Sequence, residues 1–438
     1  METTQNVNAV QPDYGCKAYK RSRKAYAMEC TFEYFVSLLV TDAFLAKVLL
    51  SIGMSPGAIQ PVATLIALSQ LFQLFSIFVV QRITNVKRFV MPIHMAGQLF
   101  FMLLYFVPFM PFAKEYKSVI AVSCIMIAYF GNYFVTNIIY NWGNSYVSPT
   151  WRGLFGAKKE TLSLLSGIFP TLIIAYAMDA FERNDNLEGG FLFAAIGILI
   201  FCISDFVCLL LIKNDVKPRE QIKKSEPIGV VMKKLSKIRG FWYILILTVL
   251  WNVGIYTTVG SLGTYKVEEL GFDMWPVTWI AIGGCLARAA LSRPFGKYAD
   301  KHSRSKALIL AMLMAVASFA VNIFTTPDSK YLIIVHTLLY SACFAGIGVN
   351  MLNIVYSFVP SEYFVEVSAI KNCVGGVCGF LASFVAGQFV DYMIARGNHL
   401  FGIRVYAQQI LSLVSVVVIV SAILFTKFVL EKQKEMVQ

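Results

Sequence analysis

Amide, phenol and hydroxyl side chains recur along one stretch of the sequence at the spacing of a single helical face. These side chains follow the i, i+3, i+4, i+7, i+8 pattern that places residues on one side of a helix. Amides both donate and accept hydrogen bonds, and aromatic rings cover apolar CH faces, so the stripe suits a polar, uncharged solute such as a saccharide or glycoside. The alternative for any single amide is that it only holds neighbouring helices together. The stripe comprises Tyr129, Asn132, Tyr133, Thr136, Asn137, Tyr140, Asn141 and Asn144.

The same combination of amides and aromatic rings recurs twice further along the chain. In each case the residues share roughly one helical face. We therefore predict that both sets line the same substrate-binding site as the stripe. One set is Trp251, Asn252 and Tyr256, and the other is Tyr340, Asn350 and Asn353.

Charged groups inside apolar runs are functional candidates by default, and four of them are candidates for coupling: Glu33, Asp42, Lys47 and Arg288. Glu33 and Lys47 share a helical face to within about 40° but lie about 21 Å apart along the axis. Asp42 points the opposite way, so we expect it to pack against a neighbouring helix, on a basic partner. Arg288 needs a carboxylate or several carbonyl groups, and the candidate carboxylates are Asp42, Glu33 and Asp205. A charge pair that opens on protonation would couple the protein to a proton gradient, whereas a permanent pair would be structural.

The elements that must position these residues are membrane-spanning helices. Hydrophobic residues make up 57% of the 438 and charged residues only 14%, against roughly 25% charged in a soluble domain. Continuous apolar runs of this length require helices in lipid and do not fit the short alternating strands of a barrel. We predict an all-α, multi-pass protein of the cell membrane. Its twelve runs lie near residues 30–50, 57–80, 89–109, 118–141, 161–181, 190–212, 241–262, 275–294, 307–326, 331–356, 368–390 and 405–428.

The basic residues are concentrated on one side of the predicted membrane. With the N-terminus in the cytoplasm, 29 of the 38 Lys and Arg fall on the cytoplasmic side and 7 on the other. The positive-inside rule then places both termini in the cytoplasm. The basic residues are spread over separate loops at one membrane face, which argues against a nucleic-acid-binding protein.

The chain divides into two similar halves. We predict an N-terminal tail (1–28), a six-helix bundle (29–213), a cytoplasmic linker (214–239), a second bundle (240–428) and a tail (429–438). A shift of 212 residues aligns Asn141 with Asn353 and Asp179 with Asp391. Repeated halves of this kind are typical of transporters. We expect Asp179 and Asp391, which lie near the outer ends of their runs, to be exposed caps.

Cysteines and glycines indicate packing more than chemistry. The nine Cys lie mostly within apolar runs and show no zinc-ligand or redox spacing. We therefore predict no metal site, no cofactor and no enzymatic activity. The small residues of Gly375–Gly387 recur at about four-residue spacing, which predicts close contact between helices.

The loop at residues 293–306 resembles the signature loop of the major facilitator superfamily. That signature has a Gly, an Asp four residues later, and then a basic cluster. The matching positions here are Gly296, Asp300 and Arg304. The resemblance implies two six-helix bundles whose first, fourth, seventh and tenth helices line a central cavity. It also implies that this loop is a cytoplasmic gate, made in the outward-facing state and broken in the inward-facing one. The loop at 81–88 lacks the Gly and the Asp, which suggests that the two cytoplasmic latches differ in strength.

These features together predict a monomeric secondary active transporter for a small polar organic solute. Alternating access, with symport of protons through Glu33 or Asp42, is the expected mechanism. One alternative is an exporter of amphipathic drugs or metabolites, which the 35 Phe and 16 Met would suit. An alternative of another class is a membrane receptor or enzyme that transports nothing.

Overall fold

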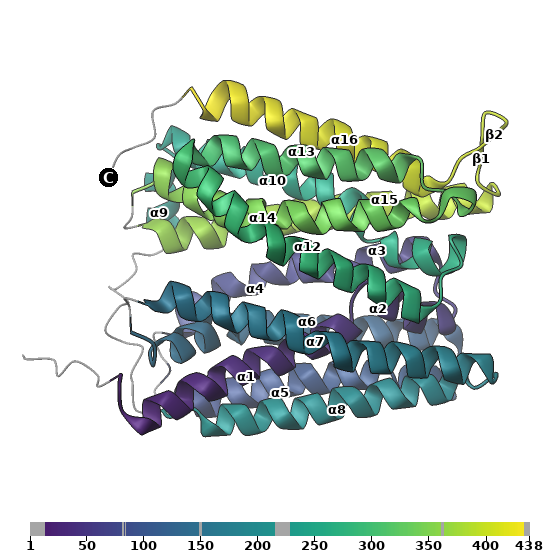
Figure 1. Ribbon diagram of the computed structural model, residues 1–438, viewed down its shortest axis with the longest axis horizontal. Coiled ribbons are helices and arrows are strands. Elements are labelled where there is room, and N and C mark those ends of the chain that lie inside the picture. The colour runs from purple at the N-terminus through teal and green to yellow at the C-terminus, as the bar shows by residue number, and fades with distance from the viewer. Residues whose placement is uncertain are drawn as a thin grey trace, which may run out of the picture.

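The computed structural model describes residues 14–80, 83, 85–148, 151–214, 228–360 and 363–432 (Figure 1). The described chain is almost entirely helical, as the composition predicts. The strands among these residues are β1 (His399–Leu400) and β2 (Ile403–Arg404), which pair antiparallel as a small hairpin.

The helices follow one another with short connections. The first group is α1 (Lys17–Leu39), α2 (Asp42–Ser51), α3 (Pro56–Ala63), α4 (Leu65–Val80), α5 (Val86–Leu104), η1 (Val107–Phe109), α6 (Lys114–Asn144), α7 (Arg152–Arg183) and α8 (Leu187–Leu211). A short helix, α9 (Ile228–Leu235), precedes the second group. That group is α10 (Arg239–Val259), α11 (Leu262–Thr264), η4 (Tyr265–Glu269), α12 (Met274–Lys301), α13 (Arg304–Ile323), η5 (Pro327–Ser329), α14 (Leu332–Phe358), α15 (Phe364–Ala395), α16 (Ala407–Phe425) and η7 (Thr426–Leu430).

Many of these helices have the length and composition of membrane spans. Within the described residues, eight helices are long and apolar enough to cross a membrane, or nine if one bent pair counts as a single span. Each of the twelve apolar runs falls, to within a few residues, on one helix or on consecutive helices. The local apolar pattern therefore located the helices correctly.

The bent pair places a carboxylate where a straight helix would not. Helices α1 and α2 meet at an angle of 47° around Val40 and Thr41. Asp42, the first residue of α2, has a φ of 50°, which few residues other than glycine adopt. The bend interrupts the helical phase, so Lys47 does not keep the orientation relative to Glu33 that one continuous helix would give.

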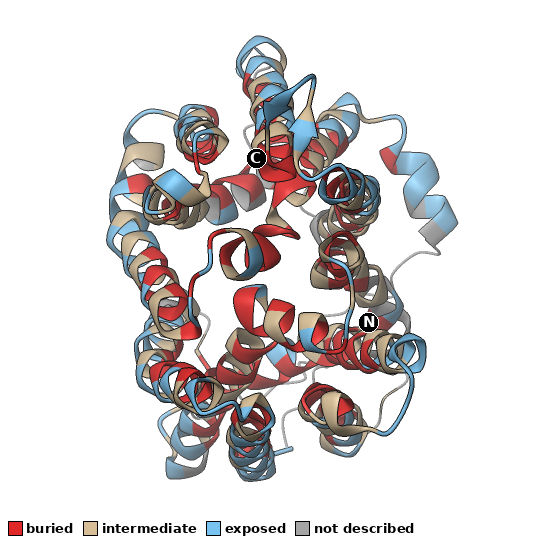
Figure 2. Ribbon diagram, turned by 90° about the vertical axis from the view of Figure 1, so that its right-hand side faces the viewer, coloured by how far each residue is buried: buried red, intermediate tan, exposed pale blue. Residues whose placement is uncertain are grey.

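The helices run roughly parallel, with the two described ends of the chain on one side. In Figure 1 the helices up to α8 gather in the lower part, and those from α10 onward in the upper part. We call the side that carries β1 and β2 the hairpin end, and the side where α1 begins and η7 finishes the terminal end. Figure 2, which views the hairpin end, shows buried residues turned inward and exposed residues around the outside.

The apolar core is continuous between the two groups at the hairpin end. One cluster joins residues of α1, α2, α5 and α8 to Leu262, Met274 and Ile333 of the second group. Towards the terminal end, separate clusters serve the two groups, one built from residues between Ala25 and Ile212 and one from residues between Leu235 and Leu430. The two groups are thus packed together most tightly at the hairpin end.

Candidate functional site

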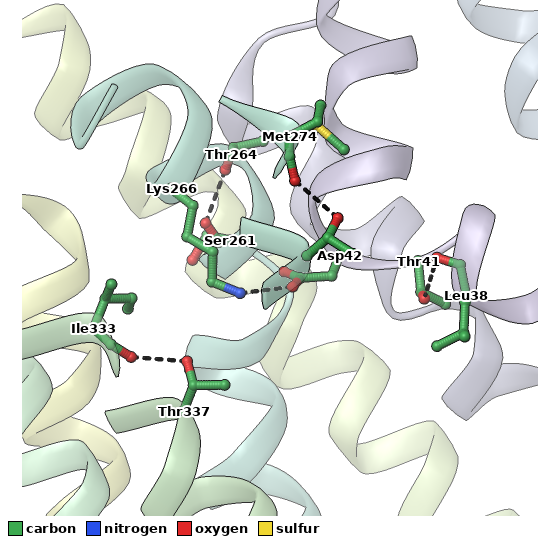
Figure 3. Close-up of polar contacts among 10 residues, drawn as sticks. Leu38, Thr41, Asp42, Ser261, Thr264, Lys266, Met274, Ile333 and Thr337 are labelled. Carbon is green, nitrogen blue, oxygen red and sulfur yellow. Dashed lines mark hydrogen bonds and ion pairs between the residues drawn. The ribbon is translucent and has the colours of Figure 1, made fainter. Parts of the chain in front are cut away.

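An ion pair joins the two helix groups at the hairpin end. The Lys266 ammonium lies 2.6 Å from Asp42 Oδ2, and the Lys266 side chain is only 5% exposed (Figure 3). Backbone contact brings the two elements together, because a Cβ on Gly263 would lie 2.4 Å from the Asp42 carbonyl oxygen. Glycine is therefore required where α11 crosses the break between α1 and α2. Asp42 packs on a basic partner from a neighbouring helix, as the sequence indicated.

A second contact between the groups is made by Asp179 of α7. Its carboxylate accepts hydrogen bonds from the backbone N–H groups of Met274, at 2.9 Å, and Trp275, at 2.7 Å. These are the first residues of α12, whose N-terminal N–H groups have no partner within the helix. The positive end of the α12 dipole further favours the carboxylate. Asp179 is 3% exposed, so it is a cap, but a buried cap on a helix of the other group.

Asp391 of α15 makes the corresponding contact in the opposite direction. Its carboxylate accepts from the Gly57 backbone N–H at 2.9 Å and from the Ser55 hydroxyl at 2.8 Å, at the N-terminus of α3. Asp179 and Asp391 are the pair that the 212-residue shift aligns. Each half of the chain therefore caps a helix of the other half with an equivalent residue. We call Asp42, Asp179 and Asp391, with the groups they bind, the hairpin-end latch.

Close backbone packing extends the latch along α4 and α15. A Cβ on Gly376 would lie 2.1 Å from the Ala67 carbonyl oxygen, far inside van der Waals contact. The small-residue spacing of Gly375–Gly387 is thus confirmed as a helix-packing surface. Together with the continuous core, these contacts hold the two helix groups together at the hairpin end.

The predicted stripe on α6 divides between buried and more exposed positions. Tyr129 and Asn132 are buried, the former packed edge-on against Phe101 with ring centroids 5.0 Å apart and the latter facing Gly97 of α5. Tyr133, Thr136 and Asn137 are half-buried, and Tyr140 and Asn141 are exposed. The Thr136 hydroxyl donates to the Asn132 carbonyl at 2.7 Å. The exposed part of the stripe lies towards the terminal end.

The predicted residues of α10 and α14 lie partly beside the stripe. The Tyr256 phenol is close enough to those of Tyr129, Tyr133 and Tyr340 for electrostatic interaction. These four phenols come from α6, α10 and α14.

The remaining predicted residues of α10 and α14 mainly contact their own group. Trp251 is buried and packs edge-on against Phe344, with ring centroids 6.0 Å apart. The Asn252 amide donates to the Thr248 carbonyl, and the Asn350 amide donates to the Gly346 carbonyl. The side chain of Asn353 lies outside the described residues.

The predicted coupling residues find separate partners. The Lys47 ammonium contacts the Glu182 carboxylate of α7 at 2.5 Å. The Arg288 guanidinium lies 3.4 Å from the Glu160 carboxylate of α7, which was not among the three candidate partners. Both side chains of this pair are more than 40% exposed. An exposed pair of this kind contributes little stability. Glu33 lies within electrostatic reach of a buried cluster described below.

The predicted gate residues lie at the end of α12 and the start of α13, where Gly296 makes no close contact with another described helix. No described atom lies within 4 Å of a Cβ built on Gly296, so Gly296 is not at a close helix approach here. Arg304 donates to the Ser357 hydroxyl at 2.9 Å, within the second group. The side chain of Asp300 lies outside the described residues.

Sequence reasoning missed one group of buried ionisable side chains. Glu29 of α1, His94 of α5 and Asp205 of α8 meet in the interior of the first group. His94 and Asp205 are 111 residues apart, so no local spacing could reveal the cluster. The only available signal was the presence of ionisable residues in apolar runs.

Comparison with known proteins gives a consistent picture of the fold. A sequence profile of the Major Facilitator Superfamily matches residues 30–383, whereas no curated protein matches the sequence. The structure is similar to that of a point mutant of the nucleoside transporter NupG, with a TM-score of 0.73, 12% identity and coverage of 93% of this chain and 99% of that one.

Two further solved structures share this architecture. A D-xylose-proton symporter aligns with a TM-score of 0.64 and 12% identity, over 92% of this chain and 97% of that one. A bacterial homologue of the iron transporter ferroportin, in its inward-facing state, aligns with a TM-score of 0.62 and 13% identity, over 93% and 98%. Identities this low relate the folds and leave the cargo of the present chain to be argued from its own residues.

Proposed function

Because the chain belongs to the major facilitator superfamily, we propose that it is a secondary active transporter of a small polar organic solute in the cell membrane. The family and the transporter fold of its structural neighbours indicate a transporter and not an enzyme. In this proposal twelve spans form two six-helix bundles, residues 29–213 and 240–428, which work as a monomer. The two halves alternate access to a central site by rocking against each other.

The hairpin-end latch is the observation that carries this proposal. The excess of basic residues assigns the terminal end to the cytoplasm and the hairpin end to the outside. In this proposal the latch and the continuous core close the outer side, while no described atom lies within 4 Å of a Cβ built on Gly296 in the gate loop. In this proposal the structure is an inward-facing state, and alternating access requires the latch to break when the outer side opens.

A hydroxylated, uncharged cargo fits the residues between the two groups. The phenols of Tyr129, Tyr133, Tyr256 and Tyr340 come from three helices and lie near one another. Phenols and amides bind solutes that both donate and accept hydrogen bonds, as sugars and nucleosides do. The similarity to a nucleoside transporter and to a xylose symporter supports this class, and we favour a saccharide or glycoside.

Thermal unfolding of the purified protein tests the cargo class. We expect sugars or nucleosides, and not lipophilic amines, to raise the melting temperature, because a ligand that binds only the folded state stabilises it. Replacing Asn137 or Tyr256 by alanine should remove the shift, whereas Phe324→Ala, at a position 69% exposed, should keep it. Stabilisation by amphipathic compounds alone, insensitive to Asn137→Ala, would instead support the exporter alternative.

Coupling to protons is proposed through Asp42. This carboxylate faces Lys266 in the latch and lies within electrostatic reach of His336 and Tyr340 on α14. Protonation of Asp42 would remove one charge of the pair and favour opening of the outer side.

Amide variants measure this coupling in proteoliposomes. Asp42→Asn is expected to abolish uptake driven by a proton gradient while exchange of substrate across the membrane continues, because the amide cannot carry the proton. Glu33→Gln is the parallel variant for the other predicted carboxylate. Uptake against a gradient that is unchanged in both variants would remove proton coupling through these residues.

A further inference from the structure

Three ionisable side chains meet in the interior of the first helix group, away from the contacts between the groups. Glu29 and His94 are 0% exposed and Asp205 is 1% exposed. One possible ligand atom of each lies within 4.8 Å of those of the other two. The three side chains come from α1, α5 and α8, so the cluster joins three separate spans.

The hydrogen bonds within the cluster leave several buried atoms without a partner. His94 Nε2 lies 2.7 Å from Asp205 Oδ2, and Glu29 Oε2 accepts from the Cys30 thiol at 3.1 Å. Among the described residues, nothing hydrogen-bonds Glu29 Oε1, Asp205 Oδ1 or His94 Nδ1. Most buried polar atoms in proteins are paired, and an unpaired set at one point indicates a bound ion or water.

The excess of negative charge in the cluster also favours a bound cation. Two carboxylates face one imidazole, and Glu33 adds a further carboxylate within electrostatic reach of His94 and Asp205. A neighbouring lysine, Lys159, donates to the Tyr26 hydroxyl and the Cys30 thiol, each at 3.1 Å, and lies within electrostatic reach of Glu33, so its charge offsets one of the three carboxylates. A net negative charge in an apolar interior is costly unless it is balanced.

We propose that Glu29, His94 and Asp205 bind one divalent transition-metal ion. A neutral imidazole and two carboxylates neutralise a dication, and they supply one nitrogen and two oxygen ligands. Zinc sites that keep an open position for water have three protein ligands, and imidazole with carboxylate also suits Fe²⁺ and Mn²⁺. The bound ion would tie α1, α5 and α8 together within the first group. This site is independent of the proposed polar cargo.

Zinc titration of the metal-free protein tests the proposal. The full-length transporter is purified in detergent, treated with a chelator, and titrated with Zn²⁺ by calorimetry. We expect one ion per chain, and at least a tenfold weaker affinity in each of Glu29→Gln, His94→Gln and Asp205→Asn. The matched control is the double variant His302→Gln/His399→Gln, which removes two exposed histidines and should bind as the wild type does.

A second measurement covers the case in which a cluster variant does not fold. Co²⁺ added to the wild-type protein should give the visible absorption of a four-coordinate nitrogen and oxygen site, and Zn²⁺ should displace it. The proposal fails if the wild type binds neither ion. It also fails if binding persists in folded variants of all three cluster residues, or if it is lost in the double histidine variant, because the ion would then lie elsewhere.

Discussion

Replacing Asp179 and Asp391 together by alanine is expected to open the hairpin end and to reduce transport roughly a hundredfold. Each carboxylate accepts two hydrogen bonds at a helix N-terminus of the opposite group. Loss of such a cap costs about 1–2 kcal/mol. The two caps share no partner, so their free-energy costs should be close to additive. A sum of about 3 kcal/mol shifts the equilibrium between closed and open outer states by about two orders of magnitude.

Spin labels across the hairpin end report this change directly. Labels at Glu188, on the first turn of α8, and Phe401, in the hairpin, are exposed and belong to opposite groups. Pulsed electron resonance should show a longer distance in the double variant, in a background without native cysteines. Asp273→Ala is the matched control, because Asp273 lies at the same N-terminus of α12 and makes no capping hydrogen bond. An unchanged distance in the double variant would show that the carboxylates do not hold the outer side closed.

Gly376→Ala is expected to reduce transport tenfold to a hundredfold by holding α4 and α15 apart. The added Cβ would lie 2.1 Å from the Ala67 carbonyl oxygen and 3.0 Å from the carbonyl carbon. Both atoms are backbone, so no side chain can rotate away, and overpacking of this kind costs about 1–3 kcal/mol. The cost falls on the state in which the two helices touch, so the closed outer state is disfavoured.

A second helical glycine separates the steric effect from a change in helix propensity. A Cβ on Gly348 of α14 would meet no atom of the described residues within 4 Å, and alanine is favoured over glycine in a helix by about 1 kcal/mol. Gly348→Ala should therefore leave transport intact and raise the melting temperature slightly. Uptake rates and melting temperatures of the two variants measure the difference. Equal transport by both would contradict the close contact of α4 with α15.

The class of protein and the position of its helices could be read from the sequence. Apolar runs report burial in lipid residue by residue, so each run fell on a helix or on consecutive helices. The loop at 293–306 likewise identified the family, which the profile match over residues 30–383 confirms. Small-residue spacing in α15 predicted close packing, because only small side chains let two backbones approach.

The partners of the charged residues could not be read in this way. Asp42 was expected to contact a basic residue, but the sequence could not indicate that this residue is Lys266, which is 224 residues away. Arg288 was expected on one of three carboxylates and lies beside Glu160 instead. Asp179 was expected to be an exposed cap and proved to be buried against α12. In each case the partner depends on which helices lie side by side, and hydropathy carries no information about that.

What the sequence determined alone was the set of local properties: span positions, charge asymmetry, helix-packing surfaces and family. Only the tertiary structure decided that the two groups are joined at the hairpin end, that Asp179 and Asp391 cap helices of the opposite group, and that Glu29, His94 and Asp205 share one buried cluster. The physical reason is distance. A helix forms from hydrogen bonds four residues apart, whereas these contacts join residues brought together only when separate helices pack.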